Sequence, residues 1–502
     1  MTIFAQALTF VAQMASITIL ARVLMPADFG IVTMVTTFSV LLVSCGHIGF
    51  PDAVLQRDEI DRSLASNLFW MNVAVGLVLT AGFAGAGHAL SKLYGDPRVG
   101  YIAPPIALSI LFDSAAALHI ALLKRAMCFA AVSANDILAR IGSVLVSVTL
   151  GLSGFGYWAL VAGVVASPFF FCVGAWSRCR WIPSLPRRRA GTRSMLRFAV
   201  QVYGRFSLGY VTQNIDNLLV GWRFGPTVLG FYKKAYDLFV LPFNLLTVYS
   251  VAVSTLSRLN ADRAEYKRYL LGGLSVLALV GMAVAGTLTV VGKDVVRALL
   301  GPRWETAGDI FVFFGPGIGA MLIYSTHGMI HLSIGTTGRF LRWGLCEFTV
   351  TLALFALALR WGARGIAGAW TVSYWLLIVP AFWYAGKPIG LKVTEVLGAV
   401  WKCMLASLLA GGGCYGIERS IPALSLTPSD SVHAIVRTVV MSSLFVLLYS
   451  AAVALLHGGG APFRPLWRII LDFLPRRIVS KLSIPTETGA LTPSASQASG
   501  TN

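Results

Sequence analysis

The stretch that decides the fold is ARVLMPADFGIVTM at residues 21–34, which has a second version, VGWRFGPTVLGFYKK, at residues 220–234. Pro26 recurs as Pro226 and Gly30 as Gly230, and both pairs share one offset. Each stretch has the pattern of an apolar helix, a tight turn and a second helix, because proline fixes φ and glycine tolerates unusual backbone angles. One such turn is ordinary, whereas several features at a single offset indicate a duplicated unit.

The composition is that of a membrane protein. Of the 502 residues, 56% are hydrophobic and only 12% are charged, and the mean hydropathy is +0.75. Soluble domains carry about 25% charged residues, so lipid is the expected solvent for most of this chain. Apolar windows of about 20 residues, the length of one membrane-spanning helix, recur from end to end. The fold class predicted is therefore an all-α polytopic membrane protein.

Apolar windows and their Gly, Pro and charged breaks predict about fourteen spans, the first of them directly after Met1, where the features of a removable signal peptide are missing. The predicted spans are residues 3–24, 29–50, 64–90, 101–123, 130–152, 155–176, 198–223, 229–250, 270–291, 309–332, 340–360, 365–386, 395–417 and 434–457.

The basic residues predict the orientation of these spans. The formal net charge is +19, and the densest basic run, RCRWIPSLPRRRAGTRSMLR at residues 178–197, lies between the sixth and seventh spans. Lys and Arg stay on the cytoplasmic side, so both termini are expected inside. The charge is then a topology signal with anionic membrane lipids as partners, and nucleic acid is not expected. The tail from residue 482 is rich in Ser, Thr, Pro and Gly and is expected to be disordered.

The repeated turns predict how the spans are grouped. Six spans lie between Pro26 and Pro226, an even number, so the second copy enters the membrane facing the same way as the first. The halves are then parallel repeats of six helices, followed by two extra C-terminal helices, and this is a plan used by carriers with alternating access. The predicted division is an N-terminal bundle at 1–176, a basic cytoplasmic linker at 177–197, a C-terminal bundle at 198–386, two additional helices at 387–457 and a cytoplasmic tail at 458–502.

Several motifs resemble one transporter family. LARVLMPADFG, DAVLQR, SNLFWMN and LYGDP in the first half, with IDNLLVG and GPTVLGFYKKAY in the second, resemble the Wzx-type, and most closely the WzxC-like, polysaccharide flippases. These belong to the multidrug/oligosaccharidyl-lipid/polysaccharide exporter superfamily, and the resemblance covers roughly residues 5–400.

The resemblance implies a function and a location. It implies a multi-pass protein of the bacterial inner membrane that turns a polyprenyl-pyrophosphate-linked oligosaccharide towards the periplasm, for exopolysaccharide, capsule or lipopolysaccharide synthesis. Partners would be that lipid-linked substrate and, beyond it, polysaccharide polymerase and export proteins. A multidrug exporter or lipid II flippase of the same superfamily stays an alternative, and a membrane polymerase or ligase is a less favoured one, since no large outer loop is predicted.

Enzyme signatures are missing from the sequence. There is no P-loop, no G-x-S-x-G and no H-E-x-x-H, and the seven cysteines have no C-x-x-C spacing. The prediction is a transporter without catalytic residues, cofactor or metal, and ATP is not the expected energy source.

A pyrophosphate and sugars must cross about 30 Å of hydrocarbon, so the route needs basic and polar residues inside the bundle. In the seventh predicted span, Arg205, Gly209, Thr212 and Asp216 fall on one helical face, flanked by Gln213 and Asn217, and Gln13 lies at the matching place in the first span. These residues are predicted to line a substrate cavity. Interhelical hydrogen bonding, worth about 0.6 kcal/mol per contact, is the alternative.

Two further basic residues are candidates for substrate binding. Arg140 lies about ten residues into the fifth predicted span, where it either faces phosphate or forms an ion pair with Asp136. Lys234 lies near the outer end of the eighth span, where snorkelling to the interface is the simpler interpretation.

The energy source has two candidate explanations. Moving two negative charges outward through an inside-negative potential gains about 2.3 kcal/mol per charge per 100 mV, which would drive the flip. Proton or sodium antiport through Asp216, Asp113 or Glu347 is the competing explanation.

Overall fold

A computed structural model describes residues 2–47, 62–185, 193–246, 249–420 and 431–463, and every element in these ranges is helical. Ten of the helical stretches in the described ranges are long and apolar enough to cross a membrane, so the predicted all-helical membrane fold is confirmed. The helices of the first half are α1 (Thr2–Val23), α2 (Pro26–His47), α4 (Arg62–Tyr94), α5 (Pro97–Arg125), α6 (Phe129–Leu152) and α7 (Tyr157–Cys179). Those of the second half are α8 (Arg193–Leu246), α9 (Tyr249–Arg258), α10 (Arg263–Leu300), α11 (Glu305–Ser333), α12 (Thr337–Ala358), α13 (Gly362–Gly386), α14 (Val393–Ser420) and α16 (Ser431–His457).

The helices are longer than the apolar windows that predicted them. Helix α10 has 38 residues, against a predicted window of 270–291. Its start is fixed outside that window, because the side chain of Asp262 accepts hydrogen bonds from the backbone N–H groups of Ala264 and Glu265. Hydropathy reports only the length that lies in hydrocarbon, and a capped helix continues beyond it. The stretches 48–61, 421–430 and 464–502, including the predicted tail, lie outside the described residues.

Helix α8 folds back on itself at the second copy of the repeated turn. Gly225 has φ 79° and ψ 179°, a backbone conformation that favours glycine, and Pro226 begins the helix again behind it. The two limbs then lie side by side, because the hydroxyl of Tyr232 donates a hydrogen bond to the carboxyl group of Asp216. In the first half the corresponding turn separates α1 from α2, and Asp28 accepts a hydrogen bond from the backbone of Met25 there. We call the side of the molecule that holds these turns the Pro26 end.

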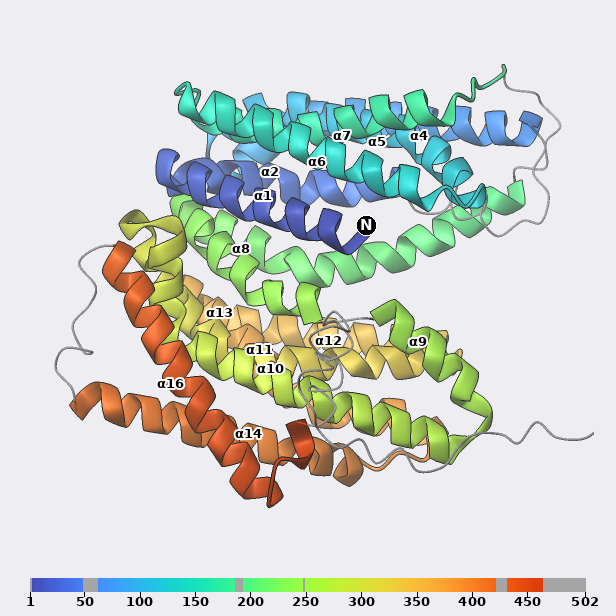
Figure 1. The fold of residues 1–502 in the computed structure, drawn as a ribbon. Coiled ribbons are helices and arrows are strands. Elements are labelled where there is room, and N and C mark those ends of the chain that lie inside the picture. The colour runs from blue at the N-terminus through green and yellow to red at the C-terminus, as the bar shows by residue number, and fades with distance from the viewer. Residues whose placement is uncertain (1, 48–61, 186–192, 247–248, 421–430, 464–502) are drawn as a thin grey trace, which may run out of the picture.

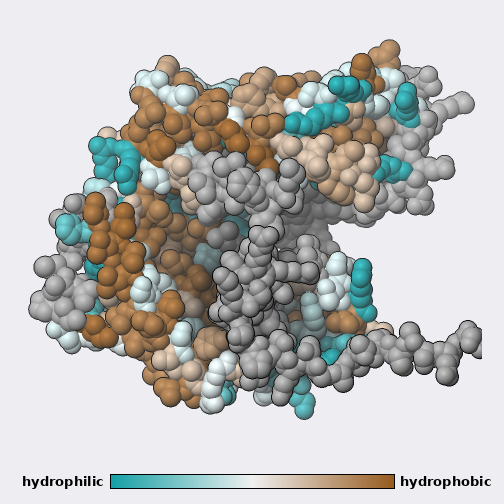
Figure 2. Space-filling model, viewed as in Figure 1, coloured by the Kyte–Doolittle hydropathy of each residue, from teal (hydrophilic) through white to brown (hydrophobic). Residues whose placement is uncertain are grey.

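The two halves share a core at the Pro26 end. Figure 1 shows α1, α2 and α4–α7 stacked above α8, and α9–α16 below it. One hydrophobic cluster joins Ile31 and Tyr94 of the first half to Val220, Trp304 and Phe314 of the second. The remaining clusters stay within one half each. Figure 2 shows the surface hollowed between the halves on the side away from the shared core. The described parts of the halves are therefore joined at one end and parted at the other.

Helices α14 and α16 attach to α10. The hydroxyl of Ser407 donates to the carbonyl of Met282 at 3.0 Å, and the hydroxyl of Tyr449 donates to the carbonyl of Leu279 at 2.8 Å. Gly286 makes room for this contact, because a Cβ there would lie 2.2 Å from the ring of Phe445. Figure 1 shows the pair on the outer side of the second half, away from the first.

Candidate functional site

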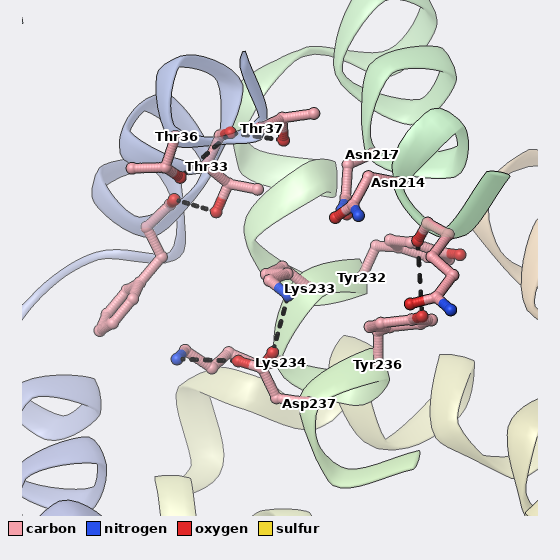
Figure 3. A network of polar contacts seen from close by, with 12 residues as sticks. Thr33, Thr36, Thr37, Asn214, Asn217, Tyr232, Lys233, Lys234, Tyr236 and Asp237 are labelled. Carbon is pink, nitrogen blue, oxygen red and sulfur yellow. Dashed lines mark hydrogen bonds and ion pairs between the residues drawn. The ribbon is translucent and has the colours of Figure 1, made fainter. Parts of the chain in front are cut away.

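Charged and polar residues meet where the returning limb of α8 faces α2. Lys233 and Lys234 both pair with Asp237, with Nζ–Oδ distances of 2.9 and 3.3 Å (Figure 3). Two ammonium groups share one carboxylate, so the trio carries a net positive charge. The ammonium group of Lys234 also lies 4.6 Å from the ring centroid of Phe29 in the first half, and its side chain is only 11% exposed. Burying an ammonium group costs free energy unless the charge is paired, and one carboxylate offsets only one of the two positive charges, which makes the trio a candidate for anion attraction.

Helix α2 contributes hydroxyl groups opposite this trio. Thr33, Thr36 and Thr37 donate to carbonyl groups of their own helix, and Figure 3 shows them across from Asn214 and Asn217 of α8. Each hydroxyl oxygen keeps lone pairs that can accept a further hydrogen bond. Polar groups of both halves therefore surround the same region, and such an arrangement can bind hydroxyl-rich ligands together with an anion.

The threonines of α2 were not among the predicted site residues, although the repeat contains the signal for them. The offset that relates Gly30 to Gly230 also relates Thr33 to Lys233 and Thr37 to Asp237. Subtracting this offset from the residue numbers of Lys233 and Asp237 therefore identifies the two threonines.

The predicted stripe on α8 is divided between buried and exposed positions. Thr212, Asp216 and Asn217 are buried, whereas Gln213 is exposed. The carboxyl group of Asp216 accepts from the hydroxyl of Tyr232 at 2.6 Å, from the indole N–H of Trp370 at 2.9 Å and from the backbone N–H of Asn217 at 2.8 Å. Asp216 thus ties both limbs of α8 to α13.

The other predicted binding residues lie on different elements. Gln13 is exposed on α1. Arg140 on α6 is exposed and forms an ion pair with Asp136 at 2.9 Å. Arg205 lies in α8, but its side chain falls outside the described residues. The structure does not bring Arg140 and Lys234 together, and a substrate-binding role for each of these residues stays a prediction.

The two remaining candidates for ion coupling lie in separate halves. Asp113 is half-buried on α5. Glu347 is half-buried on α12, near the hydroxyl of Tyr324, and that hydroxyl accepts a hydrogen bond from the indole N–H of Trp343 at 2.9 Å. Asp216, Asp113 and Glu347 form no common cluster, and among the described residues no group of three or more His, Cys, Asp or Glu has the arrangement of a metal site.

Comparisons with known proteins agree with this architecture. A family model described as polysaccharide biosynthesis protein matches residues 19–309. The succinoglycan biosynthesis transport protein ExoT of Rhizobium meliloti is 23% identical over 381 residues, which cover 75% of this chain and 76% of that protein. The lipopolysaccharide biosynthesis protein WzxC of Escherichia coli is 22% identical over 305 residues, 58% of this chain and 60% of that protein.

Two solved structures share the fold. The lipid II flippase MurJ, in an inward closed conformation, has a TM-score of 0.72 at 13% identity and covers 90% of this chain and 98% of its own. An inward-facing multidrug resistance MATE family transporter of the MOP superfamily has a TM-score of 0.59 at 12% identity, over 76% of this chain and 94% of its own. The resemblance found in the sequence motifs is confirmed, and the chain belongs to the polysaccharide biosynthesis protein family.

Proposed function

We propose that this chain is a flippase that carries polyprenyl-pyrophosphate-linked oligosaccharide repeat units across the bacterial inner membrane by alternating access. The observation that carries the proposal is family membership, combined with two helical halves that share a core at one end only. A passage between such halves solves the physical problem of this substrate, because sugars and a pyrophosphate need polar surroundings through about 30 Å of hydrocarbon. The apolar chain of the lipid can stay in the bilayer meanwhile.

We also propose how the chain crosses the membrane. The chain spans the membrane fourteen times, as two parallel six-helix repeats and two extra helices, if the two limbs of α8 count separately. The last turns of α5 and α7 hold Lys124, Arg125 and Arg178 and lie away from the Pro26 end (Figure 1), so we place that side in the cytoplasm. Both termini are then cytoplasmic, and the hollow between the halves faces the leaflet on which the substrate is made. The structure would represent an inward-open state.

A reconstitution experiment tests the function. The purified full chain is placed in liposomes that contain a radiolabelled lipid-linked oligosaccharide, and the head groups that reach the far leaflet are measured with a membrane-impermeant glycosidase. We expect flipping of the lipid-linked oligosaccharide that depends on the protein. In parallel assays we expect no flipping of lipid II and no transport of a drug. Preference for lipid II or a drug would favour the corresponding alternative, and joining of repeat units would favour a polymerase.

The same liposomes separate the two candidate energy sources. An imposed potential without an ion gradient is expected to accelerate flipping in the direction that moves the phosphates to the positive side, since two charges gain about 4.6 kcal/mol at 100 mV. Flipping that ignores the potential and responds to a proton or sodium gradient would favour antiport.

The role of Arg140 is tested with its ion-pair partner. If the guanidinium attracts phosphate, Arg140→Ala lowers export at least about tenfold at unchanged protein level. This factor corresponds to the loss of one charged contact worth about 1.4 kcal/mol or more. Asp136→Asn then keeps export, because the cation remains. Equal losses in both variants would assign Arg140 to structure instead. Arg268→Ala is the matched control, since Arg268 forms an exposed pair with Glu265 near the start of another helix.

A further inference from the structure

The two copies of the repeated turn touch each other through their backbones. A Cβ on Gly30 would lie 1.8 Å from the carbonyl oxygen of Pro226, and a Cβ on Gly230 would lie 1.9 Å from the carbonyl oxygen of Pro26. Real Cβ atoms do not approach other atoms below about 3.0 Å. The obstacle is backbone in both cases, so no side chain can move aside. Glycine is therefore required at both positions by the approach of the halves, and neither glycine has a positive φ that would demand it otherwise.

The contact is reciprocal. The first turn of α2 and the first turn of the returning limb of α8 cross, and each glycine Cα–H points at the proline carbonyl of the other turn. Such Cα–H···O contacts are worth only about 0.5–1 kcal/mol each. Small residues let helix backbones approach closely inside membranes. The fit at this contact is thus tight while the bonds that hold it are weak.

Further contacts surround this crossing and also join the halves. The indole N–H of Trp304 donates to the carbonyl of Ala21 at 2.8 Å, and the guanidinium of Arg22 donates to the carbonyl of Ala298 at 3.1 Å. The fully buried ring of Trp304 packs edge-on against Phe29 and Phe231, with centroid distances of 5.3 and 5.8 Å. One residue of each half thus packs on the same indole.

We infer that the two P-x-x-x-G turns form a seal between the halves, which closes the passage at the Pro26 end and separates in every transport cycle. The inference rests on the proposed alternating access, because a passage that is open at one end must close at the other. Close backbone packing suits such a seal because it excludes solvent and ions, and the Cα–H···O contacts of the crossing itself add little to the cost of opening. Each copy of the turn then has two roles. It connects two helices of its own half, and it closes against the turn of the other half.

The inference is tested with Gly30→Ala and Gly230→Ala. Met34→Cys serves as reporter, because Met34 lies one turn behind Gly30 on the same helix face, is fully buried and contacts Gly221 of the other half. Spheroplasts are treated with a membrane-impermeant maleimide, and the chain without the reporter corrects for native cysteines. With both glycines present the reporter is expected to be protected.

Each alanine should hold the halves apart at this end. We expect each variant to shift the equilibrium from the closed towards the open state at this end, so that the rate of labelling from outside rises about tenfold or more. Export should fall by a similar factor. The double variant should resemble each single one, because both act on one contact. Gly82→Ala and Gly85→Ala in α4 are matched controls, since a Cβ on either meets nothing within 4 Å.

The outcomes separate the seal from the function. Unchanged labelling in both folded glycine variants would overturn the seal, whatever the export assay gives. If either variant fails to reach the membrane, Trp304→Phe replaces it: this change removes the hydrogen bond to Ala21 but keeps a ring, and it should raise labelling too. Increased labelling together with a wild-type chain that flips no substrate in liposomes would retain the seal and reject the proposed function.

Discussion

Asp216→Ala is expected to lower the free energy of unfolding by about 2–6 kcal/mol, because it leaves two buried donors without an acceptor at about 1–3 kcal/mol each. The donors are the hydroxyl of Tyr232 and the indole N–H of Trp370, and the side chain of Asp216 has no exposed surface. The loss is measured as a lower melting temperature of the protein in lipid nanodiscs and as less protein in the membrane. Gln213→Ala, on the exposed face of the same turn, should leave both values unchanged.

Single-donor variants divide this effect between its contacts. Tyr232→Phe and Trp370→Phe each remove one donor and keep a ring, so each should cost less than Asp216→Ala. Asp216→Asn keeps an acceptor but cannot ionise. We expect it to retain the response of flipping to membrane potential, and loss of a response to a proton gradient in this variant alone would assign Asp216 to antiport. A melting temperature of Asp216→Ala equal to that of the wild type would contradict the structural role.

The helices were predictable because few backbone conformations are stable in lipid. A backbone in hydrocarbon must satisfy its own hydrogen bonds, so an apolar window of about 20 residues indicates a helix with little ambiguity. The turn at Pro226 was also predictable from the sequence, because proline and glycine interrupt helices both inside and outside the membrane. Helix ends were less predictable. The start of α10 depends on Asp262, and a polar cap lies outside any hydropathy window.

Side-chain partners were not predictable from the helical pattern. Periodicity places Thr212 and Asp216 on one face of α8, but it does not reveal which helix covers that face. The indole that binds Asp216 lies 154 residues away in the sequence. Lys234 shows the same limit: its position near a helix end favours snorkelling, whereas the structure places its ammonium group over Phe29 of the other half. Rotation and pairing of helices are decided by packing, which a single sequence does not contain.

Arg437→Ala is expected to destabilise the attachment of α14 and α16 by about 1.5–3 kcal/mol, because it removes charge-assisted hydrogen bonds from a partly buried ion pair. The guanidinium of Arg437 binds Asp294 of α10 with Nη1–Oδ1 3.4 Å and Glu418 of α14 through Nη2. Asp294 is 7% exposed, so the change leaves a buried carboxylate near a second one. The measurement is thermal unfolding in nanodiscs, with limited proteolysis near the connection between α14 and α16 as a local readout.

Two further variants show whether charge balance is the cause. Adding Asp294→Asn to Arg437→Ala should restore part of the stability, because one of the two uncompensated charges is removed, whereas Asp294→Asn alone should destabilise. Arg419→Ala is the matched control: this arginine is near the same end of α14, and its described contact is with the ring and hydroxyl of Tyr415 rather than an acid. If the double variant is no more stable than Arg437→Ala, lost packing of the long side chain explains the defect, and the ion pair contributes little to holding the extra helices on α10.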